Sequence, residues 1–113
     1  MSAITTHVLD TARGRPAATI SVTLHRQAVA GVWHQLGAGV TDAEGRVTDL
    51  LAGEPLEIGV YRITFGAEEY QRAVGGDSFY PEVSVEFRVT DPDVHYHVPL
   101  LLSSYGYSTY RGS

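Results

Sequence analysis

The sequence predicts an all-β fold, an antiparallel β-sandwich of about eight short strands with one short helix. Apolar and polar residues alternate with a period of two over several segments, which is typical of strands that bury one face. Turn residues, mainly Gly, Pro and Asp, separate these segments about every eight to twelve residues, a spacing typical of sandwiches. The 113 residues, 43% of them hydrophobic, suffice for a hydrophobic core, and we expect a single domain over residues 1–113.

The first half of the chain contains four expected strands. Residues 19–25 alternate clearly between apolar and polar side chains, as a half-buried strand does. The turn-like segments 10–16 and 42–45 follow the first and third strands. The expected strands are residues 4–9, 19–25, 32–41 and 46–48.

The second half contains the one expected helix and four more strands. Residues 67–74 are the only convincing helical segment, and Gly75-Gly76 ends it. Pro81 precedes a cleanly alternating segment, and Asp91-Pro92-Asp93 turns the chain into the last pair of strands. The expected strands are residues 56–65, 83–89, 94–103 and 105–111.

The composition excludes several classes of function. The chain has no cysteine, which rules out disulfides, thiolate metal sites and cysteine nucleophiles, and it has no lysine for Schiff-base chemistry. A net charge of −5 without a basic stripe argues against a nucleic-acid partner. No stretch approaches the ~18 apolar residues of a membrane span, and we see no secretory signal. We therefore expect a cytoplasmic protein with no membrane partner.

The end of the chain concentrates polar groups in an alternating, strand-like segment, which predicts a tied-down terminus that helps to build a site. His95 and His97 are two residues apart and should share one face of a strand. Three interpretations are open: a zinc site completed by a third ligand such as His7, a general base with a structural neighbour, or two ordinary polar residues on a solvated face.

Four further residues are candidates for chemistry, although none is decisive alone. His7 lies in the first expected strand, where a histidine is more often structural than functional. Arg46 follows a glycine at a turn, where an arginine is usually a solvated surface residue. Tyr110 and Ser113 offer a phenol and a hydroxyl in the last segment.

Taken together, four segments resemble the 5-hydroxyisourate hydrolases, the transthyretin-like enzymes of urate breakdown. Residues 6–17 (THVLDTARGRPA) resemble the opening signature of this family, and residues 41–46 match its Thr-Asp-x-x-Gly-Arg block. Residues 95–103 (HYHVPLLLS) and 107–113 (YSTYRGS) match its ending. The resemblance covers the whole chain. One departure is Ser104, which stands where the family usually has proline.

The resemblance implies a function and a set of site residues. It implies that His7, Arg46, His97 and Ser113 are catalytic and that His7, Arg46 and Tyr110 bind substrate. The implied reaction is hydrolysis of 5-hydroxyisourate to 2-oxo-4-hydroxy-4-carboxy-5-ureidoimidazoline, with neither cofactor nor metal. It also implies a homotetramer, a dimer of dimers with sites where the dimers meet.

The chemistry of these residues indicates how such a site would work. A neutral histidine, either His7 or His97, would take a proton from water, and the Arg46 fork would bind a substrate rich in carbonyl groups. Like charges in the site should lower the histidine pKa values. His95 is expected to assist by orienting or hydrogen bonding.

Two alternatives belong to other functional classes. One is a transthyretin-like protein that binds a small ligand without catalysis. The other is a zinc-binding sandwich that uses His7, His95 and His97.

Overall fold

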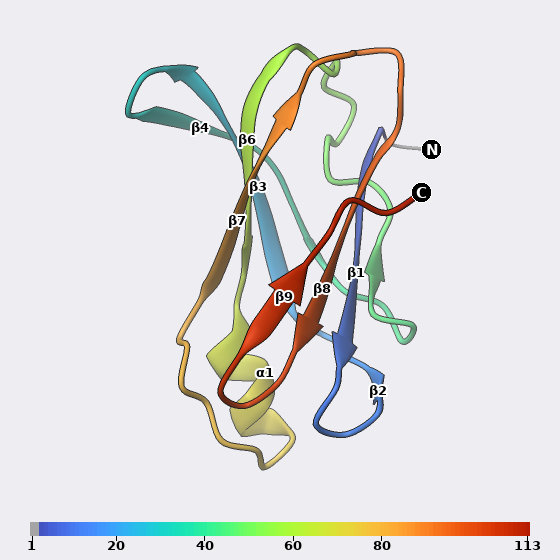
Figure 1. The fold of residues 1–113 in the computed structure, drawn as a ribbon, viewed down its shortest axis with the longest axis vertical. Coiled ribbons are helices and arrows are strands. Elements are labelled where there is room, and N and C mark those ends of the chain that lie inside the picture. Colours follow the sequence, from blue (N-terminus) through green and yellow to red (C-terminus); the bar gives the residue numbers. More distant parts are fainter. Residues whose placement is uncertain (1–2) are drawn as a thin grey trace.

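The computed structural model describes residues 3–113, which form two β-sheets packed face to face and one short helix at one end of them (Figure 1). One sheet has the strand order β2-β1-β8-β9, with β5 also paired to β1, and the other has the order β4-β3-β6-β7. The elements are β1 (Ile4–Asp10), β2 (Arg15–Pro16), β3 (Ser21–Val29), β4 (Val32–Val40), β5 (Arg46–Val47), β6 (Gly59–Phe65), α1 (Ala67–Ala73), β7 (Val83–Val89), β8 (Tyr96–Leu102) and β9 (Tyr107–Thr109). The predicted all-β sandwich with one short helix is confirmed.

The core lies between the two sheets and follows from the period-two pattern of the strands. Val8 and Leu100 from the first sheet and Ile63 and Phe65 from the second are fully buried members of one apolar cluster. Each side chain of this size contributes roughly 1.5–3 kcal/mol when it leaves water. The sandwich is therefore held mainly by the inward half of each strand.

One pair of strands departs from the predicted antiparallel arrangement. β1 and β8 run parallel, in a register that extends from Ile4 opposite Tyr96 to Asp10 opposite Leu102. The buried hydroxyl of Thr6 adds a 2.6 Å hydrogen bond to the Val98 carbonyl across this pair. The pairing places the first and eighth strands side by side in the sheet (Figure 1).

The helix α1 fastens one end of this pair. The Tyr70 hydroxyl donates a 2.7 Å hydrogen bond to the Asp10 carboxylate, and the Gln71 amide donates to the Ser103 carbonyl at 2.9 Å. Burial, followed by the bond to Asp10, raises the pKa of Tyr70 to about 12, so the phenol stays protonated and keeps donating its hydrogen bond to Asp10.

Within residues 3–113, no helix is long and apolar enough to cross a membrane.

Several strand boundaries differ from the predicted ones for identifiable reasons. Thr19 has a φ of +64°, so β3 begins at Ser21 and not at Thr19. At its other end β3 continues to Val29, because it pairs with β4 in a hairpin through Gly31. The segment predicted as a turn, residues 10–16, also contains the two-residue strand β2 paired to β1.

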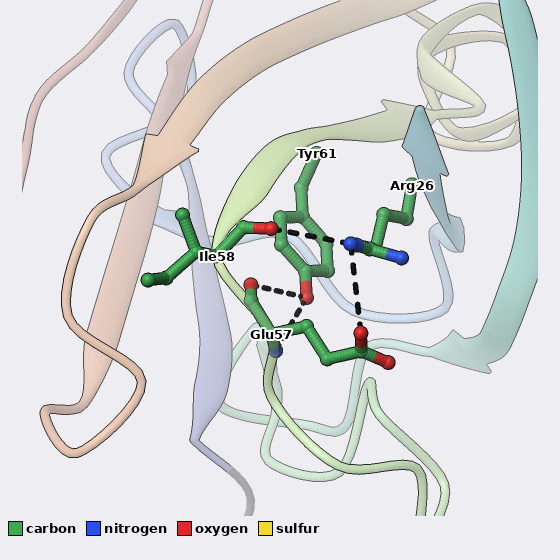
Figure 2. A network of polar contacts seen from close by, with 4 residues as sticks. All are labelled: Arg26, Glu57, Ile58 and Tyr61. Atoms are coloured by element: carbon green, nitrogen blue, oxygen red, sulfur yellow. Dashed lines mark hydrogen bonds and ion pairs between the residues drawn. The ribbon is translucent and has the colours of Figure 1, made fainter. Parts of the chain in front are cut away.

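The strand β6 begins later than predicted, at Gly59, because the residues before it fold back. The Tyr61 hydroxyl donates to the Glu57 carbonyl at 2.9 Å and accepts from the Glu57 N–H at 3.0 Å. Arg26 on β3 donates to the Ile58 carbonyl at 3.2 Å and lies 3.6 Å from the Glu57 carboxylate (Figure 2). These contacts hold residues 57 and 58 outside the sheet ladder.

Candidate active site

Successive side chains of β1 point to opposite faces of the sheet. Ile4, Thr6 and Val8 are completely buried and face the core. Thr5 and His7 alternate with them and therefore belong to the outer face of the sheet, away from the sandwich interior. The outer face of the strand thus carries a hydroxyl and an imidazole where the inner face carries mostly hydrocarbon.

Arg46 reaches the same face from β5, where it pairs with His7 across the antiparallel ladder. Its position depends on the preceding turn, in which the Asp42 carboxylate accepts a 3.0 Å hydrogen bond from the Arg46 N–H. That bond is the main reason why the pKa of Asp42 is lowered. Gly45 has a φ of +78°, and a Cβ there would lie 2.4 Å from the Val8 carbonyl oxygen. Glycine thereby allows the turn to dock directly on β1.

His97 lies on this outer face in β8. β8 begins at Tyr96 and not at the predicted residue 94, so His95 lies just before the strand, on the same side as His97. Thr5 lies opposite His97 in the parallel ladder. The Thr5 Oγ1 lies 2.8 Å from His97 Nδ1 and 2.9 Å from His95 Nε2, and the two ring centroids are 6.3 Å apart. One buried hydroxyl therefore connects both imidazoles.

The last residues of the chain are held against β8. β9 pairs with β8, and the Arg111 guanidinium lies 4.8 Å from the centre of the Tyr96 ring. The Gly112 N–H then donates a 2.8 Å hydrogen bond to the His97 carbonyl. A Cβ at Gly112 would lie only 2.6 Å from His97 Cδ2, so a side chain here would displace the imidazole. The structure thus shows the tail fastened within its own chain, with Ser113 following directly after this contact.

These elements enclose a cavity of ≈260 Å³ on the outer face of the sheet. This volume lies just below the usual range of ligand pockets, about 300–1,000 Å³, and suits a small substrate. Of the predicted site residues, the cavity brings together Arg46, His97 and Ser113. Its complete lining is Thr5, Thr6, Arg46, Thr48, His95, His97 and Ser113.

The surroundings of His97 shift its pKa. Burial lowers its pKa below the ordinary 6.5, and the neighbouring His95, His7 and Arg46 lower it further. The direction agrees with the prediction from like charges, but burial is the larger cause. The His97 imidazole is therefore neutral at pH 7 and able to accept a proton.

His7 lies beside this cavity and has one nitrogen committed elsewhere. Its Nε2 lies 2.8 Å from the Glu44 carbonyl oxygen. Because a carbonyl only accepts hydrogen bonds, this nitrogen carries a proton. In neutral His7 the free lone pair is therefore on Nδ1.

Tyr110 lies apart from this cavity within one chain. Its side chain is 58% exposed and lines a second groove of ≈270 Å³ between β7 and the β8–tail segment, which His97 also lines. Apolar side chains such as Val85 and Phe87 form part of that groove. The role of Tyr110 in binding substrate stays a prediction.

The part of the chain that the structure describes offers no ligand set for the zinc alternative. Residues 3–113 contain no group of three or more His, Asp or Glu side chains placed to hold a metal ion. His7, His95 and His97 therefore do not form the ligand set that the zinc alternative needs.

A larger hollow of ≈870 Å³ lies between residues 48–56 and Pro92, but neither histidine nor arginine lines it.

Thr5 is a site residue that the sequence alone does not reveal; it is only 5% exposed and contacts both histidines. A threonine in a strand is ordinary, and its partners are about 90 residues away in the chain. The signal that could have found it is the parallel pairing of β1 with β8, which alternation along one strand does not reveal.

Comparison with known proteins places the chain in a family. The HIUase/Transthyretin family matches residues 4–112. The chain belongs to this family. A 5-hydroxyisourate hydrolase from Caulobacter vibrioides is 46% identical over 118 residues, a match that covers 100% of both chains.

Solved structures of the family include both an enzyme and a carrier. The 5-hydroxyisourate hydrolase of Klebsiella pneumoniae matches with a TM-score of 0.84 at 33% identity, over 97% of this chain and 98% of the other. Sea bream transthyretin in complex with thyroxine matches with a TM-score of 0.88 at 31% identity, over 96% and 93% of the two chains. The fold is thus common to both, and the site residues must distinguish the functions.

Proposed function

We propose that this chain hydrolyses 5-hydroxyisourate and opens its ring to give 2-oxo-4-hydroxy-4-carboxy-5-ureidoimidazoline. The observation that carries the proposal is the meeting of Arg46 and a neutral His97 in one small cavity of this family's fold. The 46% identity to a 5-hydroxyisourate hydrolase over its whole length supports the same substrate.

His97 is the general base in this proposal, and the structure gives a reason to prefer it to His7. His7 Nε2 donates to the Glu44 carbonyl, and His7 does not line the cavity. His97 lines the cavity and has its Nδ1 held by Thr5, which leaves Nε2 for the reaction. His7 is left to position substrate or water beside Arg46.

The reaction follows from these roles. Nε2 of His97 takes a proton from water as the water oxygen forms a bond to the ring carbonyl carbon. The Arg46 guanidinium donates hydrogen bonds to the carbonyl oxygen, which becomes negatively charged. The ring C–N bond then breaks, and the leaving nitrogen takes up the proton. Ser113 holds the water or the substrate from the tail, and no step requires a cofactor or a metal.

The proposal includes an assembly and a location. We propose a homotetramer in the cytoplasm, with Tyr110 contributing to substrate binding where subunits meet. The exposed side chains of Tyr105, Tyr107 and Tyr110 near β9, and the apolar groove between β7 and the tail, support an interface at that edge.

The deciding experiment generates 5-hydroxyisourate in situ from urate with urate oxidase and follows its ultraviolet decay. Decay should accelerate with this protein above the spontaneous rate in a control without it. A decay rate equal to that control would reject the hydrolase function. Tight binding of a small hydrophobic ligand such as thyroxine, together with no acceleration, would favour the carrier alternative.

A further inference from the structure

We propose that Thr5 and His95 form a proton relay with His97, in which the Thr5 hydroxyl passes protons between the reacting imidazole and a solvent-exposed one. Thr5 and His95 are positioning and relay residues here, and the inference rests on the proposed function of His97 as the base. Thr5 lies in β1, His97 lies in β8, and His95 directly precedes β8.

The contacts of Thr5 Oγ1 restrict where the protons lie. The hydroxyl is within hydrogen-bond distance of His97 Nδ1, at 2.8 Å, and of His95 Nε2, at 2.9 Å. A hydroxyl has one proton to donate, so it donates to one ring nitrogen and accepts from the other. Exactly one of these two nitrogens then carries a proton when both rings are neutral, which couples the tautomers of His95 and His97.

The proposed role of His97 fixes the direction of the hydrogen-bonded chain in the resting site. For Nε2 to take a proton from water, the proton of the neutral ring must lie on Nδ1, which then donates it to Thr5 Oγ1 at 2.8 Å. The Thr5 hydroxyl then donates to His95 Nε2. This arrangement leaves Nε2 of His97 unprotonated, as the base requires.

Thr5 is buried and His95 is exposed, and this difference suits Thr5 to the inner part of the relay and His95 to its solvent end. Thr5 is 5% exposed, so water has little access to compete for its hydroxyl. Its branched side chain has few rotamers in a strand, and the β1–β8 ladder fixes its backbone. His95 is exposed and can exchange a proton with bulk water. The path therefore leads from the half-buried His97 to solvent.

The charges around His97 explain why a relay helps. His7, Arg46 and His95 all disfavour a positive charge on that ring. As Nε2 gains a proton from water, the Nδ1 proton moves to Thr5 Oγ1. The hydroxyl proton moves to His95 Nε2, and His95 releases its Nδ1 proton to solvent.

The relay leaves His97 neutral but with its proton on Nε2. His97 donates that proton to the leaving ring nitrogen as the reverse transfer, from solvent through His95 and Thr5, returns a proton to Nδ1, so the ring stays neutral. Over one turnover the protons exchanged with solvent cancel, and the net transfer is from the attacking water to the leaving nitrogen.

The direct test is nitrogen-15 NMR of the imidazoles at a pH at which they are neutral, and it does not depend on activity. We expect both His95 and His97 to carry the proton on Nδ1 in the wild-type protein. Thr5→Val removes the hydroxyl at constant shape and should release His95 from this tautomer. A proton on Nε2 of His97, or an unchanged His95 in Thr5→Val, would overturn the relay. His34 on β4, an exposed histidine, serves as the internal reference.

Kinetics supply the second readout. Thr5→Val should lower kcat by about tenfold or more, in the range seen when the partner that orients a histidine is lost, with KM nearly unchanged. Thr5→Ser should recover most of the loss, and Thr64→Val in the other sheet is the matched control. Wild-type kcat in Thr5→Val would refute the relay. Failure of the wild-type protein to hydrolyse 5-hydroxyisourate would reject the proposed function. The NMR result would still show whether the hydrogen bonds that link His97, Thr5 and His95 exist.

Discussion

The two faces of the β1–β8 pair have opposite chemistry although they belong to the same strands. On the inner face, Val8 and Leu100 are fully buried in the core. On the outer face, His7 and His97 lie among polar groups around a small cavity. The two sets alternate residue by residue, so the inner set fixes the positions of the outer set.

A short β-sandwich can thus carry a site on the outer face of one sheet, and no catalytic group has to lie in its hydrophobic core. The outer residues are placed by backbone pairing, such as Thr5 opposite His97 and His7 opposite Arg46. Their side chains contribute little apolar burial. Substitutions on the outer face should therefore change activity more than stability, and substitutions on the inner face should do the reverse.

The largest expected effect is on the outer face. His97→Asn should lower kcat/KM by about 10²-fold or more, because it removes the general base. The free energy of unfolding should change by less than about 1 kcal/mol, since the ring is only half-buried. Ultraviolet decay of 5-hydroxyisourate and urea denaturation measure the two quantities.

The matched control for this variant is His34→Asn on β4, where the histidine is exposed and distant from the cavity. It should leave both quantities unchanged. Activity close to wild type in His97→Asn would remove His97 from the mechanism.

The inner face should respond in the opposite way. Leu100→Ala deletes a fully buried side chain, and such changes cost about 2–5 kcal/mol of unfolding free energy. The specific activity of the protein that remains folded should stay within about threefold of wild type, since the cavity side chains are unaltered. A loss of activity much larger than this in fully folded protein would show that the two faces are not separable.

A smaller effect should come from the tail. Gly112→Ala places a methyl group 2.6 Å from the original position of His97 Cδ2 and must move the ring or the tail. Because a displacement of about 1 Å in a catalytic group can cost 10²-fold, we expect kcat/KM to fall by about tenfold. Gly106→Ala is the matched control, because its Cβ would meet only Ser103 Oγ, at 3.7 Å. Equal activities of the two variants would show that the tail does not position His97.

The sequence predicts the fold best where a strand alternates without interruption. The pattern predicts β7 with the bounds that the structure has, Val83–Val89. It fails where a side chain or a backbone angle overrides the pattern, as at Thr19 and at Glu57, which folds back onto the Tyr61 hydroxyl. The parallel pairing of β1 with β8 joins segments that are distant in the chain, and the alternation pattern within a single strand does not predict which strands pair.

The site shows a similar division. Arg46, His97 and Ser113 are predicted from their resemblance to a family and are found in one cavity. Thr5 is not predicted, because its importance comes from two hydrogen bonds that span 90 and 92 residues of chain. Spacing alone also could not rank His7 against His97. The bond from His7 to the Glu44 carbonyl and the place of His97 in the cavity support our proposal that His97 is the base.

The role of His97 as a neutral base is tested most directly by the pH dependence of kcat/KM for 5-hydroxyisourate, with a correction for spontaneous decay at each pH. Burial and nearby charges lower the pKa of His97 below 6.5, so the neutral base persists at pH 7 and is lost only as the pH falls further. We predict a level rate from about pH 8 to 6.5 and a decline below that, which His97→Asn abolishes. A rate that already declines above pH 6.5, or one that stays level to about pH 5 with chemistry limiting, would contradict a neutral His97 as the base.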